Sequence, residues 1–215
     1  MRTETSRAIR LADYTPPDYL VDTVDLDVAI HDGFTRVTMR AELRRNERSN
    51  ADAHAPLVLH GEDLLLESVR VDGVQLSEAQ LEVTEGSLAI LVPLHTSFVL
   101  ETVVQIKPDE NTQLSGLYRS KDGYFTQCEA EGFRRITYFL DRPDVMARYT
   151  TTLHADKERF PELLGNGNPI ARGDEPDGRH FVRWEDPFPK PSYLFAMVAA
   201  KLERVEDTFV TASGR

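Results

Sequence analysis

Gln127, Glu129 and Glu131 place an amide and two carboxylates at alternate positions of one short segment. Side chains alternate between the two sides of an extended strand, so these three would share one face if residues 125–131 were extended. An amide and two carboxylates on one face could bind a ligand cation through charge-assisted hydrogen bonds. The alternative is a solvated strand face next to an arginine pair, and composition by itself favours that alternative.

A dense run of charges of both signs follows this cluster. Its members are Arg134, Arg135, Asp141, Arg142 and Asp144. Guanidinium groups and carboxylates at this density favour ion pairs, which hold an irregular segment in one conformation. We therefore interpret these residues as structural ion pairs rather than as catalytic groups.

The remaining chemistry-bearing residues form no complete catalytic or metal-binding set. No histidine lies four positions from another, so the H-E-x-x-H zinc helix is absent, and no G-x-S-x-G nucleophile motif occurs. His60-Gly61-Glu62 matches the H-x-E of zinc deaminases, but a chain with one cysteine cannot supply the P-C-x-x-C partner. That cysteine, Cys128, has no adjacent histidine or helix start, so we interpret it as a small buried apolar residue.

Length and composition indicate one globular domain that binds no nucleic acid and inserts into no membrane. The 215 residues suffice for one large core, and the net charge of -11 disfavours a polyphosphate partner. No apolar run is long enough for a signal peptide or for a membrane-spanning helix. A single cysteine excludes an internal disulfide framework, which favours a reducing, cytoplasmic compartment.

Alternation of apolar and polar residues predicts strands through the first half of the chain. Residues 23–30 and 36–44 alternate with period two and should pair as an antiparallel hairpin with one wet face. Residues 98–108 form another expected strand, which ends at its proline. Tight hairpin turns are expected where glycine follows an acidic residue, at Asp72-Gly73, Glu85-Gly86 and Asp122-Gly123.

The second half is less regular but is still expected to be mostly extended. One helical turn is predicted over 144–148, followed by a β-branched strand at 150–152 and a loop at 165–169. The apolar run 192–200 is ambiguous between a buried helix and a strand, and we favour a strand. The fold is therefore predicted to be all-β, a large antiparallel, saddle-shaped or sandwich-like sheet domain with at most one or two short helical turns.

Several segments resemble the amino-terminal domain of the aminopeptidase N family, in its Gram-negative bacterial form. This family belongs to the gluzincin zinc peptidases. The segments follow the expected order and cover essentially the whole chain: "YTPPDYLVDTVDLDV", "LSGLYRSKDGYFTQCEAEGFRRITYFLDRPDVMARYTTTLHADK", "LLGNGNP" and "DPFPKPSYLFAMVA". The resemblance implies that residues 1–215 are one amino-terminal β domain, without the catalytic and carboxy-terminal domains of the family.

The resemblance also implies a function for the amide and carboxylate cluster. Members of the family carry Gln-x-Glu in a loop that reaches into the active site of the next domain, and Gln127-Cys128-Glu129 matches it. Glu129 would then bind the free α-ammonium group of a peptide substrate, and Gln127 would line the pocket for the first side chain. An α-amino group has a pKa of about 7.7 to 8.0, so it is largely cationic at neutral pH and suits a carboxylate partner.

The same resemblance implies that the bond-breaking chemistry lies outside this chain. The family continues into a thermolysin-like domain with G-A-M-E-N and H-E-x-x-H, where zinc polarises the carbonyl and activates water. Neither motif occurs here, so the chain is expected to contain no catalytic residue, to bind no zinc and to be inactive alone. Its parent would be a zinc-dependent aminopeptidase that removes amino-terminal residues from peptides, with the catalytic domain as this domain's partner. The alternative is a stand-alone β-sandwich module that binds peptides or proteins without catalysis.

Overall fold

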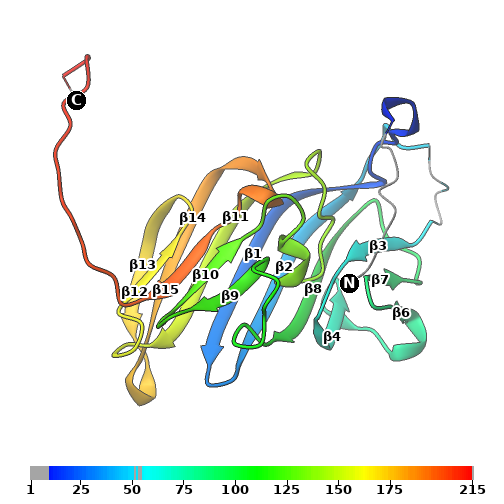
Figure 1. Ribbon diagram of the computed structural model, residues 1–215. Helices are drawn as coiled ribbons and strands as arrows, with labels where there is room; N and C mark the ends of the chain where they lie inside the picture. Colours follow the sequence, from blue (N-terminus) through cyan, green and yellow to red (C-terminus); the bar gives the residue numbers. More distant parts are fainter. Residues whose placement is uncertain (1–9, 51, 53–54, 215) are drawn as a thin grey trace.

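The computed structural model describes residues 10–50, 52 and 55–214 and confirms the all-β fold (Figure 1). The strands form an eight-stranded, a four-stranded and a three-stranded sheet. Among these residues no helix is long and apolar enough to cross a membrane. Residues 1–9, over which the sequence predicts no signal peptide, lie outside the described residues, as does Arg215.

The eight-stranded sheet runs through the whole molecule and has the first hairpin near its centre (Figure 1). In spatial order its strands are β13 (Asn168–Asp174), β14 (Arg179–Pro191), β11 (Met146–Asp156), β1 (Tyr19–His31), β2 (Phe34–Arg45), β8 (Ser97–Ile106), β4 (Leu65–Val71) and β5 (Val74–Gln75). Neighbouring strands are antiparallel except β1 and β11, which run parallel with Thr23 opposite Arg148. The sheet is therefore mixed, where the sequence predicts an antiparallel one, because the chain passes through β3 to β10 before β11 lies beside β1 as a crossover strand.

The β1–β2 hairpin confirms the predicted alternation. Val24, Leu26 and Val28 are buried on one face of β1, and each lies opposite a buried apolar residue of β2. His31 lies opposite Phe34 across the turn, in which Gly33 has a φ of 79°. Each buried valine or leucine contributes roughly 1.5–3 kcal/mol relative to an exposed one, so the register of this pair is strongly specified.

The four-stranded sheet packs against the β11 and β14 part of the large sheet and carries the candidate site. In spatial order its strands are β12 (Glu162–Gly165), β15 (Met197–Ala200), β10 (Gly123–Gln127) and β9 (Gly116–Ser120). Nε1 of Trp184 in β14 donates to the backbone oxygen of Leu163 in β12, 3.1 Å away, and so links the two layers. Phe133 lies between the layers and meets Tyr149 and Phe195 in edge-on ring contacts.

The three-stranded sheet contacts the segment that follows the candidate site. Its strands, in spatial order, are β3 (Leu57–His60), β7 (Ser87–Ile90) and β6 (Leu81–Val83). The backbones of His60 and Phe139 exchange hydrogen bonds of 2.8 and 3.0 Å, which join this sheet to that segment. Two predicted hairpin turns are confirmed, at Asp72-Gly73 between β4 and β5 and at Glu85-Gly86 between β6 and β7.

Helical structure is more frequent than predicted but very short. The described part of the chain holds five 3-10 turns of three residues each: η1 (Leu11–Asp13), η2 (Glu78–Gln80), η3 (Phe133–Arg135), η4 (Pro176–Gly178) and η5 (Ser192–Leu194). The helical turn predicted over 144–148 is wrong, because Met146 already starts β11 and pairs with Pro191 of β14. Tertiary strand pairing thus overrides the local preference of this segment.

Other local predictions are shifted rather than lost. The third hairpin turn falls at Lys121-Asp122, one residue earlier than predicted, because Gly123 already pairs with Ser120. The run 192–200 divides into η5 and the strand β15. The predicted loop at 165–169 is shorter, a turn between β12 and β13.

The carboxy-terminal segment leaves the sheets. Residues 201–214 are exposed and contain no helix or strand, and Figure 1 shows this segment, drawn in red, extending away from the body of the domain. Several of its exposed side chains are large and apolar, among them Val205, Phe209 and Val210. Covering these apolar side chains with another surface would be favourable, because it removes them from water.

Candidate functional site

The candidate site begins where β10 ends. Gln127 is the last residue of β10, which is paired on one side by β9 and on the other by β15. Just before it, Thr126 Oγ1 donates to the backbone oxygen of Met197, 3.1 Å away, and accepts from the Met197 amide at 2.9 Å. The start of the loop is therefore held by two neighbouring strands.

The loop turns back instead of continuing as a strand. The amide of Gly132 donates to the backbone oxygen of Cys128, 2.8 Å away, and η3 begins at Phe133. Residues 129–131 lie in a turn, so the condition under which Gln127, Glu129 and Glu131 would share one strand face is not met. A turn of this kind breaks the alternation of side chains that defines a strand face.

All three side chains of the predicted cluster are nevertheless exposed. Gln127, Glu129 and Glu131 face solvent, and the peptide bond that follows Glu129 is cis. Nε2 of Gln127 donates a hydrogen bond to the backbone oxygen of Glu129, 3.3 Å away. The loop thus presents an amide and a carboxylate close together on an open surface.

Cys128 points the other way and is 2% exposed, which confirms its prediction as a buried residue. Burial, with a contribution from Asp141, raises the pKa of the Cys128 thiol to about 12. A thiol with this pKa stays protonated at neutral pH and is a poor nucleophile. The loop therefore carries no reactive sulfur.

The two loop carboxylates differ in their partners. Glu131 Oε1 lies 3.3 Å from Nη2 of Arg134 and forms an ion pair with it. Glu129 is different: no donor among the residues that the structure describes pairs with its carboxylate. The unpaired carboxylate at the tip of the loop is thus free to bind a cation from outside.

The charges that follow the loop are ion-paired, as the sequence predicts. Nε of Arg134 donates to Asp141 at 3.0 Å, and Arg142 donates to Asp144 at 2.8 Å. Arg135 pairs with two acids from the turn after β3, reaching Glu62 at 2.6 Å and Asp63 at 2.5 Å.

Asp141 is the most buried of these charges. Its side chain is 1% exposed and accepts a hydrogen bond from Ser192 Oγ at 2.5 Å as well as the bond from Arg134. Its backbone amide donates to Nδ1 of His60, 3.2 Å away. Burial, and then the nearby Arg134, lower the pKa of His60, which matches a neutral ring that accepts at Nδ1.

Sequence reasoning missed three contributors to this region. Glu62 and Ser192 supply partners to Arg135 and Asp141 from positions 73 and 51 residues away, so no local pattern could reveal them. Gly132 is the third, because a Cβ atom there would overlap the backbone oxygen of Gln127 and lie 2.9 Å from Cα of Cys128. The local signal for it was a glycine at the end of an acidic turn.

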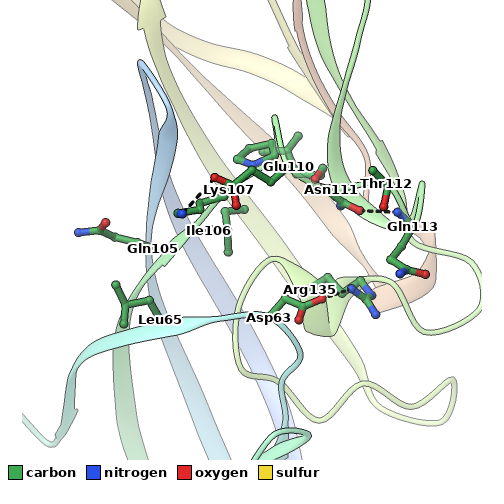
Figure 2. A pocket seen from close by; sticks show the side chains of 12 residues that line it. Asp63, Leu65, Gln105, Ile106, Lys107, Glu110, Asn111, Thr112, Gln113 and Arg135 are labelled. Carbon is green, nitrogen blue, oxygen red and sulfur yellow. Dashed lines mark hydrogen bonds and ion pairs between the residues drawn. The ribbon is translucent and has the colours of Figure 1, made fainter. Parts of the chain in front are cut away.

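A hollow lined in part by Arg135 of η3 does not contain the candidate site. Figure 2 shows this hollow of about 350 Å³, with Asp63 and Arg135 on one side and Lys107 and Glu110 on the other. Neither residue of the candidate site lines it. The Gln127 and Glu129 side chains therefore lie on an open rim, which another surface would have to cover before it could exclude water.

Comparison with known proteins gives a consistent result. A family model described as the Peptidase M1 N-terminal domain matches residues 21–194. Aminopeptidase N of Caulobacter vibrioides is 48% identical over the whole chain, and that of Escherichia coli (strain K12) is 48% identical over 94% of it. The solved structure of Legionella pneumophila aminopeptidase A in complex with aspartic acid has a TM-score of 0.89, at 40% identity over 96% of the chain.

These relatives are much longer than the chain. It spans 24% of the Caulobacter protein, 22% of the Escherichia coli protein and 24% of the Legionella chain. The resemblance inferred from the sequence motifs is thereby confirmed for this domain. The match to the family model over residues 21–194, the identity to the bacterial relatives and the all-β fold together show that the chain belongs to the peptidase M1 N-terminal domain family.

Proposed function

We propose that the chain is the amino-terminal domain of a zinc-dependent aminopeptidase, an enzyme that removes amino-terminal residues from peptides. In this role the loop after β10 anchors the substrate. Glu129 binds the α-ammonium group, and Gln127 lines the pocket for the first side chain. Family membership and the 48% identity to proteins named aminopeptidase N support this proposal.

The observation that carries the proposal is the unpaired carboxylate of Glu129. Around it, Glu131, Glu62 and Asp141 are all engaged by arginines, whereas no described residue pairs with Glu129. A carboxylate exposed at a loop tip is positioned to receive a cationic group from a second molecule. A peptide with a free amino terminus carries such a group at neutral pH.

The open position of Glu129 explains why a second domain is needed. On a solvent-exposed surface an ion pair contributes about 0–1 kcal/mol, which is too little to select one end of a peptide. Covered by a second surface, the same contact would be shielded from water and would fix the first peptide bond relative to the catalytic groups. We therefore assign substrate anchoring to this domain only in the presence of a catalytic domain.

Zinc belongs to the proposed parent and not to this domain. No three His, Cys, Asp or Glu side chains within residues 10–50, 52 and 55–214 come together in a group that could hold a metal ion. The residues present therefore do not fit the metal, and no step of metal chemistry is assigned to them. Zinc would be held by the catalytic domain, where it activates water for hydrolysis.

The carboxy-terminal segment supports a packing contact with such a partner. Val205, Phe209 and Val210 are exposed by 93%, 85% and 68%, and they lie on a segment that extends from the sheets. Apolar side chains at this density favour packing against another surface. We propose that this surface is the catalytic domain of the same polypeptide, and that the enzyme acts in the cytoplasm, where a free cysteine such as Cys128 stays reduced.

The decisive experiment is to express the gene with its complete reading frame and assay the product. The proposal predicts that translation continues past Arg215 into a catalytic domain, and that the purified protein hydrolyses a peptide with a free amino terminus. The same peptide with an acetylated amino terminus is the control and should be a far poorer substrate. A reading frame that stops near Arg215 would instead favour a stand-alone binding module and would refute the aminopeptidase role.

A further inference from the structure

The buried carboxylate of Asp141 connects three segments around the loop that carries Glu129. Oδ2 accepts from both the backbone amide and Nε of Arg134, at 3.2 and 3.0 Å, and so holds the second residue of η3 by its backbone and its side chain. Oδ1 accepts from Ser192 Oγ of η5 at 2.5 Å. A carboxylate that is 1% exposed is retained only where such donors compensate its loss of hydration.

Arg134 carries this connection from Asp141 to the loop. Its guanidinium also donates through Nη2 to the backbone oxygen of Asp141 at 3.2 Å, so the pair is joined by side chain and backbone. The same Nη2 lies 3.3 Å from Oε1 of Glu131, two residues after Glu129. Because the Arg134 side chain is only 13% exposed, it has little freedom to adopt another rotamer.

The loop formed by residues 128–132 is tightly packed. The Gly132 amide donates to the Cys128 backbone oxygen at 2.8 Å, and Gly132 packs directly against the backbone of Gln127 and Cys128. Phe133, the next residue, is fully buried among aromatic rings. A shift of η3 would therefore be transmitted to the loop rather than absorbed by it.

Within the described part of the chain, no hydrogen bond or ion pair fixes the carboxylate of Glu129. Its position is consequently determined by the backbone on either side. On the strand side that backbone is held by β9 and β15, and on the other side by η3. The η3 turn is held in turn by the hydrogen bond from the Arg134 amide to Asp141.

We propose that Asp141, through Arg134, is a positioning residue for Glu129, and that Ser192 assists it by holding the second carboxylate oxygen. This inference rests on the proposed function of Glu129 in binding the α-ammonium group. Asp141 touches no substrate: it sets the distance between the Glu129 carboxylate and the catalytic centre. A displacement of about 1 Å in such a group can lower the rate by up to about 100-fold.

The competing explanation is that Asp141 only stabilises the fold. A double-mutant cycle separates the two, because only a positioning residue loses its kinetic effect once Glu129 is removed. The cycle combines Asp141→Asn with Glu129→Gln in the complete, zinc-loaded enzyme. The measurement is kcat/KM for an aminoacyl anilide with a free amino group, together with circular dichroism to confirm folding.

We expect Asp141→Asn alone to lower kcat/KM by about tenfold or more, within the range expected for a displaced positioning contact. In the Glu129→Gln background the same change should alter kcat/KM by less than about twofold, because no carboxylate remains to be positioned. If Glu129→Gln is impaired but the two effects multiply, the positioning role is overturned while the proposed function of Glu129 stands. If Glu129→Gln itself leaves kcat/KM unchanged, the proposed function fails, and this inference fails with it.

Ser192→Ala is a second, less disruptive variant for the same test, in case Asp141→Asn does not fold. It removes one donor to Asp141 but leaves the Asp141–Arg134 pair intact. It should cause a smaller loss of kcat/KM that also disappears in the Glu129→Gln background, and a loss that persists there would overturn the proposal. The matched control is Asp109→Asn, which removes a carboxylate that is likewise bonded to an arginine, Arg119, and to a hydroxyl, that of Tyr124. Its effect on kcat/KM should be the same in the wild-type and in the Glu129→Gln background.

Discussion

Nε2 of Gln127 donates a hydrogen bond to the backbone oxygen of Glu129, so the two residues proposed to meet the substrate are linked to each other. This bond uses the main chain of Glu129 and leaves its carboxylate available. It also directs the Gln127 amide along the loop rather than back over β10. The proposed amine site and the proposed side-chain pocket are therefore parts of one small unit.

Replacing Glu129 with glutamine should weaken recognition of unblocked substrates by the complete enzyme. A charge-assisted hydrogen bond to the α-ammonium group is worth about 1.5–3 kcal/mol, which corresponds to a loss of roughly 10- to 150-fold in kcat/KM. Steady-state kinetics with an aminoacyl anilide provide the measurement. Glu82→Gln, at an exposed position of β6, is the control and should behave as wild type. Unchanged kinetics in Glu129→Gln would remove this residue from the site.

The 215-residue chain by itself should hydrolyse no aminoacyl anilide, with or without added zinc. Its described residues offer no group that could hold the metal, and Glu129 lies on an open rim. The assay compares the purified chain with the complete enzyme at equal concentration. Zinc-dependent turnover by the pure chain would contradict the assignment of catalysis to another domain.

Gly132→Ala should destabilise the chain by about 1–3 kcal/mol, because the added methyl group would be forced against the backbone of Gln127 and Cys128. Denaturant unfolding followed by circular dichroism measures the change. Gly86→Ala is the matched control, since a Cβ atom there meets nothing within 4 Å. Equal stability of the two variants would show that the loop has more room than these contacts indicate.

Cys128 should react slowly with iodoacetamide in the native chain and rapidly after denaturation. Burial raises the pKa of its thiol to about 12, so almost no thiolate is present at neutral pH. Labelling rates followed by mass spectrometry at pH 7.5 test this. Cys128→Ser should in addition leave the activity of the complete enzyme largely intact, and an inactive but folded variant would give the thiol a role that we do not assign.

His154 links strands that are distant in sequence. It is held between Glu175, 2.7 Å from Nδ1, and Asp27 on β1, 3.0 Å from Nε2. The hydrogen bond with Asp27 is the largest effect and raises the pKa of His154. Desolvation lowers this pKa, but the charges of Asp27 and Glu175 raise it further, so the net shift is upward. A raised pKa means that folding favours the protonated ring.

The free energy of unfolding should therefore depend on pH through His154. The stabilisation that His154 contributes is fully present below its pKa in the unfolded chain, about 6.5. It is lost as the pH rises through the higher pKa of the folded protein. We expect the difference in stability between wild type and His154→Gln to be larger at pH 6 than at pH 9. Denaturant unfolding curves at both pH values measure this difference. A difference that is constant or grows with pH would contradict the stabilising role of the His154 contacts with Asp27 and Glu175.

Much of the fold follows from local patterns. The alternation of Val24, Leu26 and Val28 predicts both the strand β1 and its buried face. Asp72-Gly73 marks the separate hairpin of β4 and β5, because both residues adopt a positive φ. The parallel pairing of β1 with β11 could not be predicted in this way. It joins distant segments and involves no turn, so it leaves no signature in either strand.

The candidate site was predictable to a similar extent. The types and spacing of Gln127 and Glu129 indicated a polar site, but only the resemblance to a family suggested its ligand. The turn that separates Glu131 from them depends on the tight packing of Gly132, and the partners of Asp141 come from distant segments. Such long-range contacts are determined by packing of the whole domain and not by neighbouring residues.

The parallel contact between β1 and β11 also constrains how the domain can be made. Asp27 and His154 meet across it although 127 positions separate them in the chain. During synthesis β1 therefore leaves the ribosome long before its neighbour on that side exists, while β2 follows at once. One edge of the nascent hairpin remains unpaired until β11 emerges, so the central sheet is completed late during synthesis.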